Sequence, residues 1–165
     1  MRFKYCLTNK NIMKYSRIST FKDFVGELKV VYKRTQLPSQ KVLDSRSASS
    51  FMRYYYDNSM DDFEEAKILH LNRNNCIVNI THLTKGSDSG TLIPVKTIIR
   101  DLCLIKTSSF ILFHNHPSGN LKPSMADIGI SKKLQSIGEL IDVKLLDSII
   151  LTRESYYSLK DNLDI

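Results

Sequence analysis

The sequence predicts an α/β fold, in which short strand-like segments alternate with segments of helical periodicity. Residues 109–113 (SFILF) form a short, fully apolar run that is typical of a buried strand. Residues 94–106 and 124–138 each place apolar side chains at helical spacing. From residue 67 onward the predicted order is strand, strand, helix, strand, loop, helix, strand, strand, which favours a sheet covered by helices.

The first part of the chain is the less regular one. Residues 1–12 are expected to form a loose extension, and Met13 is an alternative start of translation. Residues 17–33 suit a helix that turns into a strand, and Leu37-Pro38-Ser39 ends that segment. Residues 47–56 begin with serines and continue with apolar side chains at near-helical spacing, so we expect a helix capped by the serine run.

The second part has clear strand and turn signals. Two apolar runs, 67–71 and 76–82, flank the polar residues 72–75 and predict a β-hairpin. Residues 86–90 are expected to be a loop, and the helix over 94–106 has a proline in its first turn. A loop over 114–123 leads from the buried strand to the helix over 124–138, which is expected to stop near Gly138. Separate strands over 143–146 and 149–152 follow, and residues 156–159 close the fold.

Length and composition indicate an ordinary globular protein. The chain has 165 residues, 42% hydrophobic and 25% charged, which fits one principal core. No apolar stretch is long enough to span a membrane, and the first twelve residues are too polar for a signal peptide, so we expect a cytoplasmic location without membrane contact. Cys6, Cys76 and Cys103 are far apart and form no C-x-x-C pair, so we expect reduced, structural cysteines.

The positive charge is concentrated in the first quarter of the chain. The net charge is +7, and residues 1–41 hold ten lysines or arginines against Asp23 and Glu27 only. Residues 42–165 are close to neutral. We therefore divide the chain into a basic N-terminal segment, 1–41, and a domain over 42–165. Such a segment is compatible with contacts to DNA phosphates, and equally with a solvated segment that has no partner.

The strongest chemical signal follows the buried strand. His114, His116, Ser124 and Asp127 have the form H-x-H-x7-S-x-x-D. Two imidazoles two residues apart on an extended segment point the same way, and a carboxylate from the next helix can complete a set of three zinc ligands with one open position. Ser124 and Asp127 also form a helix capping box, so Ser124 can cap the helix and serve the site at once.

This pattern resembles the signature of the JAB/JAMM (MPN+) metalloproteases. The RadC-like branch in particular is similar over about residues 42–159, in the sequence segments HNHPSG, PS..D, LLDSIILT and ESYYSL. The resemblance implies an α/β fold with a mixed β-sheet flanked by helices, related to that of cytidine deaminases. It also implies a zinc-dependent hydrolase whose metal is held by His114, His116 and Asp127. The helix-hairpin-helix DNA-binding module of longer RadC proteins is not present in this sequence.

The family pattern also includes a glutamate on the first strand of the domain. Glu64 aligns with it, although Ala66 replaces the usual aromatic residue and leaves Glu65 as the alternative. The resemblance implies that zinc activates water, that Glu64 acts as general base, and that Ser124 stabilises the oxyanion during hydrolysis of a peptide or isopeptide amide. Two departures are Asn115, where many JAMM proteases have Ser or Thr, and Ser148, where RadC-like proteins commonly have His.

Competing functions have weaker signals. A zinc deaminase needs H-x-E and a later P-C-x-x-C, which this sequence does not contain. The His-Asn-His run is too compact for the nuclease motif of that name. The main alternative is an accessory protein for DNA repair or recombination, with a structural or vestigial metal site and DNA contact through the basic segment. His70 and His82 are expected to be ordinary strand residues. The oligomeric state and the substrate are left open.

Overall fold

The computed structural model describes residues 16–17, 28–29, 31, 33, 40–56, 59–85 and 93–165. The chain divides into two units, Met1–Pro38 and Ser39–Ile165. In the first unit, β1 (Ser16–Arg17) and β2 (Leu28–Lys29) pair antiparallel. The predicted extension over 1–12 and the predicted loop over 86–90 lie outside the described residues, as does most of the predicted helix and strand over 17–33.

The second unit is built on a mixed five-stranded sheet in the order β4-β3-β5-β6-β7. Its strands are β3 (Glu65–Leu71), β4 (Ile77–Lys85), β5 (Ser109–Asn115), β6 (Lys144–Leu151) and β7 (Tyr156–Ser158). Only β5 and β6 run parallel, and α3 (Met125–Leu140) connects them. The predicted α/β class with a mixed sheet flanked by helices is therefore confirmed.

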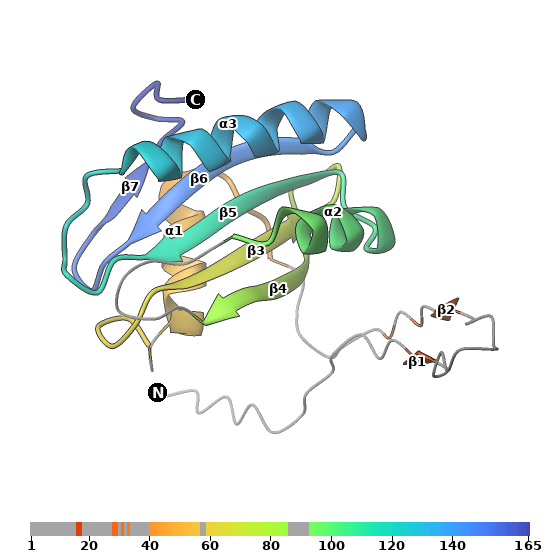
Figure 1. Ribbon diagram of the computed structural model, residues 1–165, viewed down its shortest axis with the longest axis horizontal. Coiled ribbons are helices and arrows are strands. Elements are labelled where there is room, and N and C mark those ends of the chain that lie inside the picture. Colours follow the sequence, from red (N-terminus) through yellow and green to blue (C-terminus); the bar gives the residue numbers. More distant parts are fainter. Residues whose placement is uncertain are drawn as a thin grey trace, which may run out of the picture. The chain divides into compact units, whose positions relative to one another are not determined.

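Helices cover both faces of this sheet (Figure 1). The face covered by α1 (Ser45–Arg53) packs Met52 and Tyr56 against Leu69, Ile111 and other side chains. The opposite face, covered by α2 (Val95–Leu104) and α3, packs Ile98 and Leu134 against Ile68, Phe110 and Leu112. Every residue of β5 is buried, because this central strand has a helical layer on each side.

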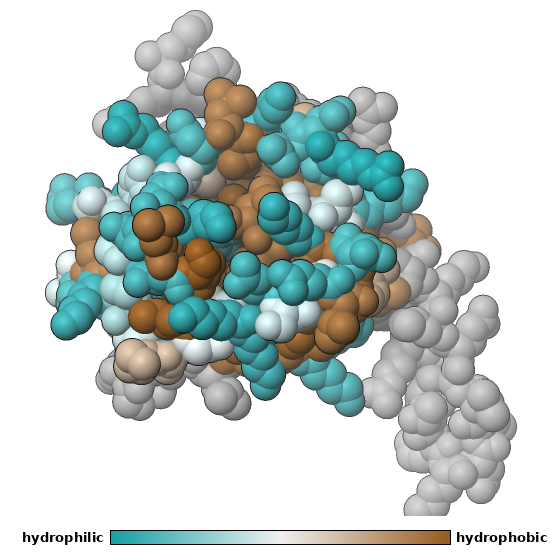
Figure 2. All heavy atoms as spheres, turned by 90° about the horizontal axis from the view of Figure 1, so that it is seen from above, coloured by the Kyte–Doolittle hydropathy of each residue, from teal (hydrophilic) through white to brown (hydrophobic). Residues whose placement is uncertain are grey.

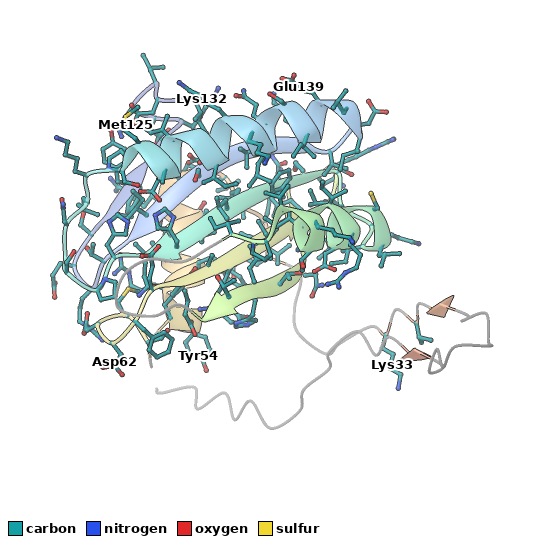
Figure 3. All side chains as sticks on the ribbon, in the orientation of Figure 1. Lys33, Tyr54, Asp62, Met125, Lys132 and Glu139 are labelled. Carbon is teal, nitrogen blue, oxygen red and sulfur yellow. The ribbon has the colours of Figure 1, made fainter. Side chains whose placement is uncertain are left out.

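The outer side of α3 is polar. Lys132 and Glu139 point away from the sheet in Figure 3, whereas Ser131 and Leu134 on the inner side are fully buried. Figure 2, seen from above the view of Figure 1, shows hydrophilic side chains over much of this surface with hydrophobic ones between them. Within the described part of the chain, no helix has the length and apolar character that a membrane span requires.

The predicted hairpin is confirmed as the antiparallel pair β3 and β4. Its turn depends on Asn72, whose side-chain oxygen accepts hydrogen bonds from the amides of Asn74 and Cys76 at 2.9 and 3.0 Å. Asn75 adopts φ 57°, a left-handed conformation that asparagine tolerates better than most residues. The observed strands, 65–71 and 77–85, therefore lie close to the predicted runs, 67–71 and 76–82.

The helix predicted over 47–56 is present, but the serine run does not cap it. α1 begins at Ser45, and its N-cap is Asp44, whose side chain accepts from the Ser47 amide. Ser47 is the third helical residue and completes a capping box by bonding back to Asp44. Residues Tyr54–Tyr56 continue as a 3-10 helix. The correction arises because aspartate and serine are comparably good caps, so composition does not choose between them.

The two strands predicted over 143–146 and 149–152 are one strand, β6. The ladder with β5 shifts register between Phe110 and Ile111, which accommodates an extra residue in β6 as a bulge. Asp147, which the sequence suggests is either a turn residue or a group that orients a ligand imidazole, is buried within the strand. Its carboxylate accepts from the Ser158 hydroxyl at 2.6 Å and the Lys160 amide at 3.0 Å. Partners from later in the chain thus keep this polar residue inside the sheet.

Two further boundaries differ from prediction. β5 continues through His114 and Asn115, so the predicted loop begins two residues later. α3 does not stop at Gly138 but continues to Leu140. A Cβ on Gly138 would collide with the carbonyl oxygen of Val143, so this glycine permits close approach of the chain to α3 instead of ending the helix.

Candidate metal centre

The two histidines of the motif lie where β5 ends. His114 is the penultimate residue of the strand and is 1% exposed. His116 follows the strand, and its amide still donates to the carbonyl oxygen of Leu151 at 2.9 Å. Because side chains alternate along extended backbone, the two imidazoles fall on the same face, separated by Asn115 on the other. Their Nε2 atoms lie 3.1 Å apart.

Asp127 reaches the histidines from the first turn of α3. Its Oδ1 lies 3.2 Å from His114 Nε2, and its Oδ2 lies 3.9 Å from His116 Nε2. Ser124 is the N-cap of the helix, and the predicted capping box is present. Figure 3 shows the start of α3, marked by Met125, at the end of the sheet toward which β5 and β6 run. The strand end and the helix start thus bring together residues 114, 116 and 127.

The spacing of these donor atoms suits a zinc ion. One ligand atom from each of His114, His116 and Asp127 lies within 4.8 Å of the others. With zinc bonds of about 2.0–2.1 Å, tetrahedral geometry separates neighbouring donors by about 3.3 Å. The separations of His114 Nε2 from His116 Nε2 (3.1 Å) and from Asp127 Oδ1 (3.2 Å) are close to that value. His116 Nε2 lies 3.9 Å from the other carboxylate oxygen, Oδ2, so His116 and Oδ1 must move closer to share one ion. Two imidazoles and one carboxylate also leave one position open, as in catalytic zinc sites.

Hydrogen bonds prepare two of these groups for a cation. His116 donates from Nδ1 to the Asn120 carbonyl oxygen at 2.6 Å, which leaves the Nε2 lone pair directed at the site. Burial raises the pKa of Asp127, but hydrogen bonds from His114 and Ser124 outweigh it and bring that pKa below its ordinary value. The carboxylate is therefore ionised at neutral pH. His114 Nδ1 is buried and has no hydrogen-bond partner among the described residues.

Ser124 has its hydroxyl engaged with Asp127. The hydroxyl donates to Asp127 Oδ2 at 2.6 Å and accepts from the Asp127 amide at 3.1 Å. The Ser124 amide donates to the same Oδ2 at 2.7 Å, so Oδ1 is the oxygen that faces His114. In this arrangement Ser124 orients the carboxylate. Donation to an oxyanion would require the hydroxyl to turn away from Oδ2.

The sheet register separates the two candidate glutamates. Ala66 is paired with His114 across the β3–β5 ladder, and Glu64 directly precedes β3, where continued alternation would set it on the face of Ala66. Glu65 lies on the α1 face, where its carboxylate accepts from Ser59 Oγ at 2.8 Å and from the buried ammonium of Lys67. Burial raises the pKa of Glu65, but these two hydrogen bonds outweigh it and lower that pKa. The geometry thus favours Glu64 over Glu65 as the site residue.

The other histidines are remote from this cluster. His70 is fully buried in β3, with its ring nitrogens 2.9 Å from the hydroxyls of Thr107 and Thr81. Burial lowers the pKa of His70 to about 4, against the raising effect of Asp101. His82 is an exposed residue of β4. Both are strand residues, as predicted.

Ser148 occupies the position where the family commonly has histidine. It is fully buried in β6, and its hydroxyl has no hydrogen-bond partner within the described ranges. Its ladder partner on β5 is Leu112, two residues before His114. The His, Cys, Asp or Glu side chains that converge among the described residues are those of residues 114, 116 and 127.

One important residue of this region was missed by the sequence analysis. Asn115 was noted only as a departure from other JAMM proteases, yet its side chain is fully buried and hydrogen-bonded to backbone groups between residues 59 and 65. The available signal was its place between two histidines at the end of a buried strand. A buried amide there must find partners, although the sequence does not say which.

Comparison with known proteins agrees with this geometry. The model of a family described as RadC-like JAB domain matches residues 43–164. A UPF0758 protein of Flavobacterium johnsoniae is 37% identical over 125 residues, which cover 76% of this chain and 54% of that protein. A UPF0758 protein of Clostridioides difficile is 31% identical over 81% of this chain and 62% of its own length. The chain thus spans little more than half the length of these relatives.

Proposed function

The chain belongs to the RadC-like JAB domain family, and from this premise we propose that it is a zinc-dependent hydrolase that cleaves a peptide or isopeptide amide bond. The observation that carries the proposal is the convergence of His114, His116 and Asp127, with donor atoms spaced as zinc requires. When bound, zinc supplies a Lewis acid that makes water nucleophilic near neutral pH and polarises a carbonyl group.

The protein's own groups then have separate tasks. His114, His116 and Asp127 would hold the ion, and the Asp127 carboxylate would neutralise part of its charge. Glu64 accepts the proton of the attacking water and passes it to the leaving amine. Ser124 orients Asp127 through the capping box, and its hydroxyl turns from Oδ2 to donate to the carbonyl oxygen as negative charge develops there.

Hydrolysis assays with matched variants test this proposal. We would load wild-type protein with zinc and assay quenched peptide probes and isopeptide probes joined through a lysine side chain. Glu64→Gln should retain zinc and lose at least about 100-fold in rate, because the general base is removed. Glu139→Gln, an exposed substitution in the last turn of α3, serves as the control. Equal rates in wild type and Glu64→Gln, or no cleavage of either probe class by zinc-loaded wild type, would count against the proposal.

A DNA-associated role is the second candidate, and the uneven charge of the chain favours it. Residues 1–41 contain ten basic and two acidic side chains. If this segment binds phosphates, affinity for duplex DNA should fall steeply with salt, and neutralising Lys29, Lys33 and Arg34 with glutamine should reduce the salt slope. If these substitutions do not affect DNA binding, the positive charge of residues 1–41 does not serve to bind DNA. The assay is independent of zinc, so it separates the two candidates.

A further inference from the structure

The Asn115 side chain connects the segment that carries Glu64 to the strand that carries the histidines. It does so beside the β3–β5 ladder and the Tyr56 hydroxyl, which bonds the carbonyl oxygens of Glu65 and Phe113. The Asn115 Oδ1 accepts from the Glu65 amide at 2.7 Å. Its Nδ2 donates to the carbonyl oxygens of Ser59, Met60 and Phe63 at 3.2, 3.0 and 2.9 Å. The amide is fully buried, so both its donor and its acceptor capacity are used inside the protein.

These bonds hold the backbone immediately before and after Glu64. The Phe63 carbonyl and the Glu65 amide are the peptide groups that flank this residue, and both bind the same side chain. Asn115 itself lies between His114 and His116 in the chain. A planar side chain that lies between the two histidines in sequence thus holds the backbone on both sides of Glu64, although Glu64 and Asn115 are far apart in the chain.

We infer that Asn115 is a positioning residue, which places Glu64 against the metal centre. The inference rests on the proposed function, because it concerns the general base of that reaction. Asparagine suits the task, since it offers one acceptor to an amide and two N–H donors, which three carbonyl oxygens share. An aspartate would set negative charge among three carbonyl oxygens, and an apolar residue would remove one hydrogen bond from each of four backbone groups.

A second set of contacts keeps the neighbouring glutamate away from the site. Ser59, whose carbonyl is bound by Asn115, donates its own hydroxyl to the Glu65 carboxylate. Lys67, which is 1% exposed, binds the same carboxylate and lies over the ring of Tyr56. Two sets of contacts therefore hold residues 59–65: those of the Asn115 side chain and those of the Glu65 carboxylate. The Glu65 carboxylate is thereby occupied on the α1 face and is not available to the histidines.

Asn115→Ser in the full chain tests this inference, because serine is too short to span the four bonds. Hydrogen exchange of the amides between residues 59 and 65 should accelerate at least tenfold, while exchange in β5 and the zinc content stay as in wild type. Asn72→Ser is the matched control, since Asn72 also binds two backbone amides but in the β3–β4 turn. It should leave exchange over 59–65 unchanged.

The kinetic readout distinguishes positioning from a merely structural role. On quenched peptide probes, Asn115→Ser should lower kcat at least tenfold with KM within about twofold, and it should have no further effect in a Glu64→Gln background. Unchanged exchange over 59–65, or equal losses in both backgrounds, overturns the inference. If Glu64→Gln leaves hydrolysis intact, the proposed function itself fails, which is a different result.

A measurement on the unaltered protein keeps the inference testable if Asn115→Ser does not fold. The two side-chain amide protons of Asn115 should exchange with solvent at least a hundredfold more slowly than those of Asn74 in the exposed turn. A buried carboxamide whose N–H groups are hydrogen-bonded is protected from water. Similar exchange rates for Asn115 and Asn74 would therefore show that Asn115 is not held by these bonds and would overturn the inference.

Discussion

His116 donates from its Nδ1 to the backbone carbonyl oxygen of Asn120, with 2.6 Å between the two atoms. A carbonyl accepts only, so the proton must lie on Nδ1 and the lone pair on Nε2. That Nε2 faces the Nε2 of His114 at 3.1 Å. The loop after β5 therefore selects the imidazole tautomer that a metal ligand needs, and it does so through backbone atoms.

The capping box should contribute to both stability and zinc affinity. Ser124→Ala removes the hydroxyl that bonds Asp127 and caps α3, which should lower the free energy of unfolding by about 1 kcal/mol. Zinc affinity should fall about tenfold or more, because Asp127 loses an orienting partner. Urea denaturation and competition with a chromogenic chelator measure the two effects. Ser136→Ala, at an exposed site of the same helix, should change neither, and equal behaviour of the two variants would refute the assignment.

Two glycines of α3 should respond to alanine in opposite directions. Nothing lies within 4 Å of a Cβ built on Gly129, so Gly129→Ala should raise the free energy of unfolding by about 0.5–1 kcal/mol through helix propensity. Gly138→Ala would meet the Val143 carbonyl oxygen and should destabilise the protein by about 1–3 kcal/mol. Urea denaturation measures both. A stabilising effect at Gly138 would show that the close approach to the following strand is not maintained in solution.

His70 should make the fold sensitive to acid. Burial lowers the pKa of His70 to about 4, whereas an unfolded chain binds this proton near pH 6.5. Protonation thus favours the unfolded state as pH falls from 6.5 to 4, and the stability present above pH 6.5 decreases by roughly 3 kcal/mol over that window.

The pH dependence of the His70→Gln variant isolates this contribution. The variant should be less stable at pH 7, since it loses the bonds to Thr81 and Thr107, but its stability should change less between pH 6.5 and 4. Denaturation series at several pH values provide the comparison. Parallel profiles for wild type and variant would mean that His70 does not cause the acid sensitivity.

Local sequence patterns predicted much of the fold and the metal group. A local pattern of apolar residues or of turn residues identifies the hairpin, the helices and the buried strand 109–113. His114, His116 and Asp127 lie on one strand, the loop after it and the start of the next helix. Because these elements follow one another in the chain, the sequence is enough to predict that the three side chains converge.

The features that escaped prediction depend on partners far along the chain. The sequence leaves the role of Asp147 open between a turn residue and a group that orients an imidazole, because the Ser158 hydroxyl and Lys160 amide that bind its carboxylate come later in the chain. Asn115 binds backbone carbonyls and an amide about fifty residues earlier, and backbone groups have no residue signature. Gly138 resembles a helix stop until the neighbouring strand is placed against it.

Zinc content of the purified protein tests the central claim most directly. Wild type and a control, His82→Ala, should each bind about one zinc ion per chain, whereas His116→Ala should bind almost none at micromolar zinc. Elemental analysis after dialysis gives the stoichiometry. The account predicts loss of zinc in His116→Ala alone among these three proteins. Wild type that takes up no zinc after refolding with the metal, or His116→Ala that retains a full equivalent, would contradict it.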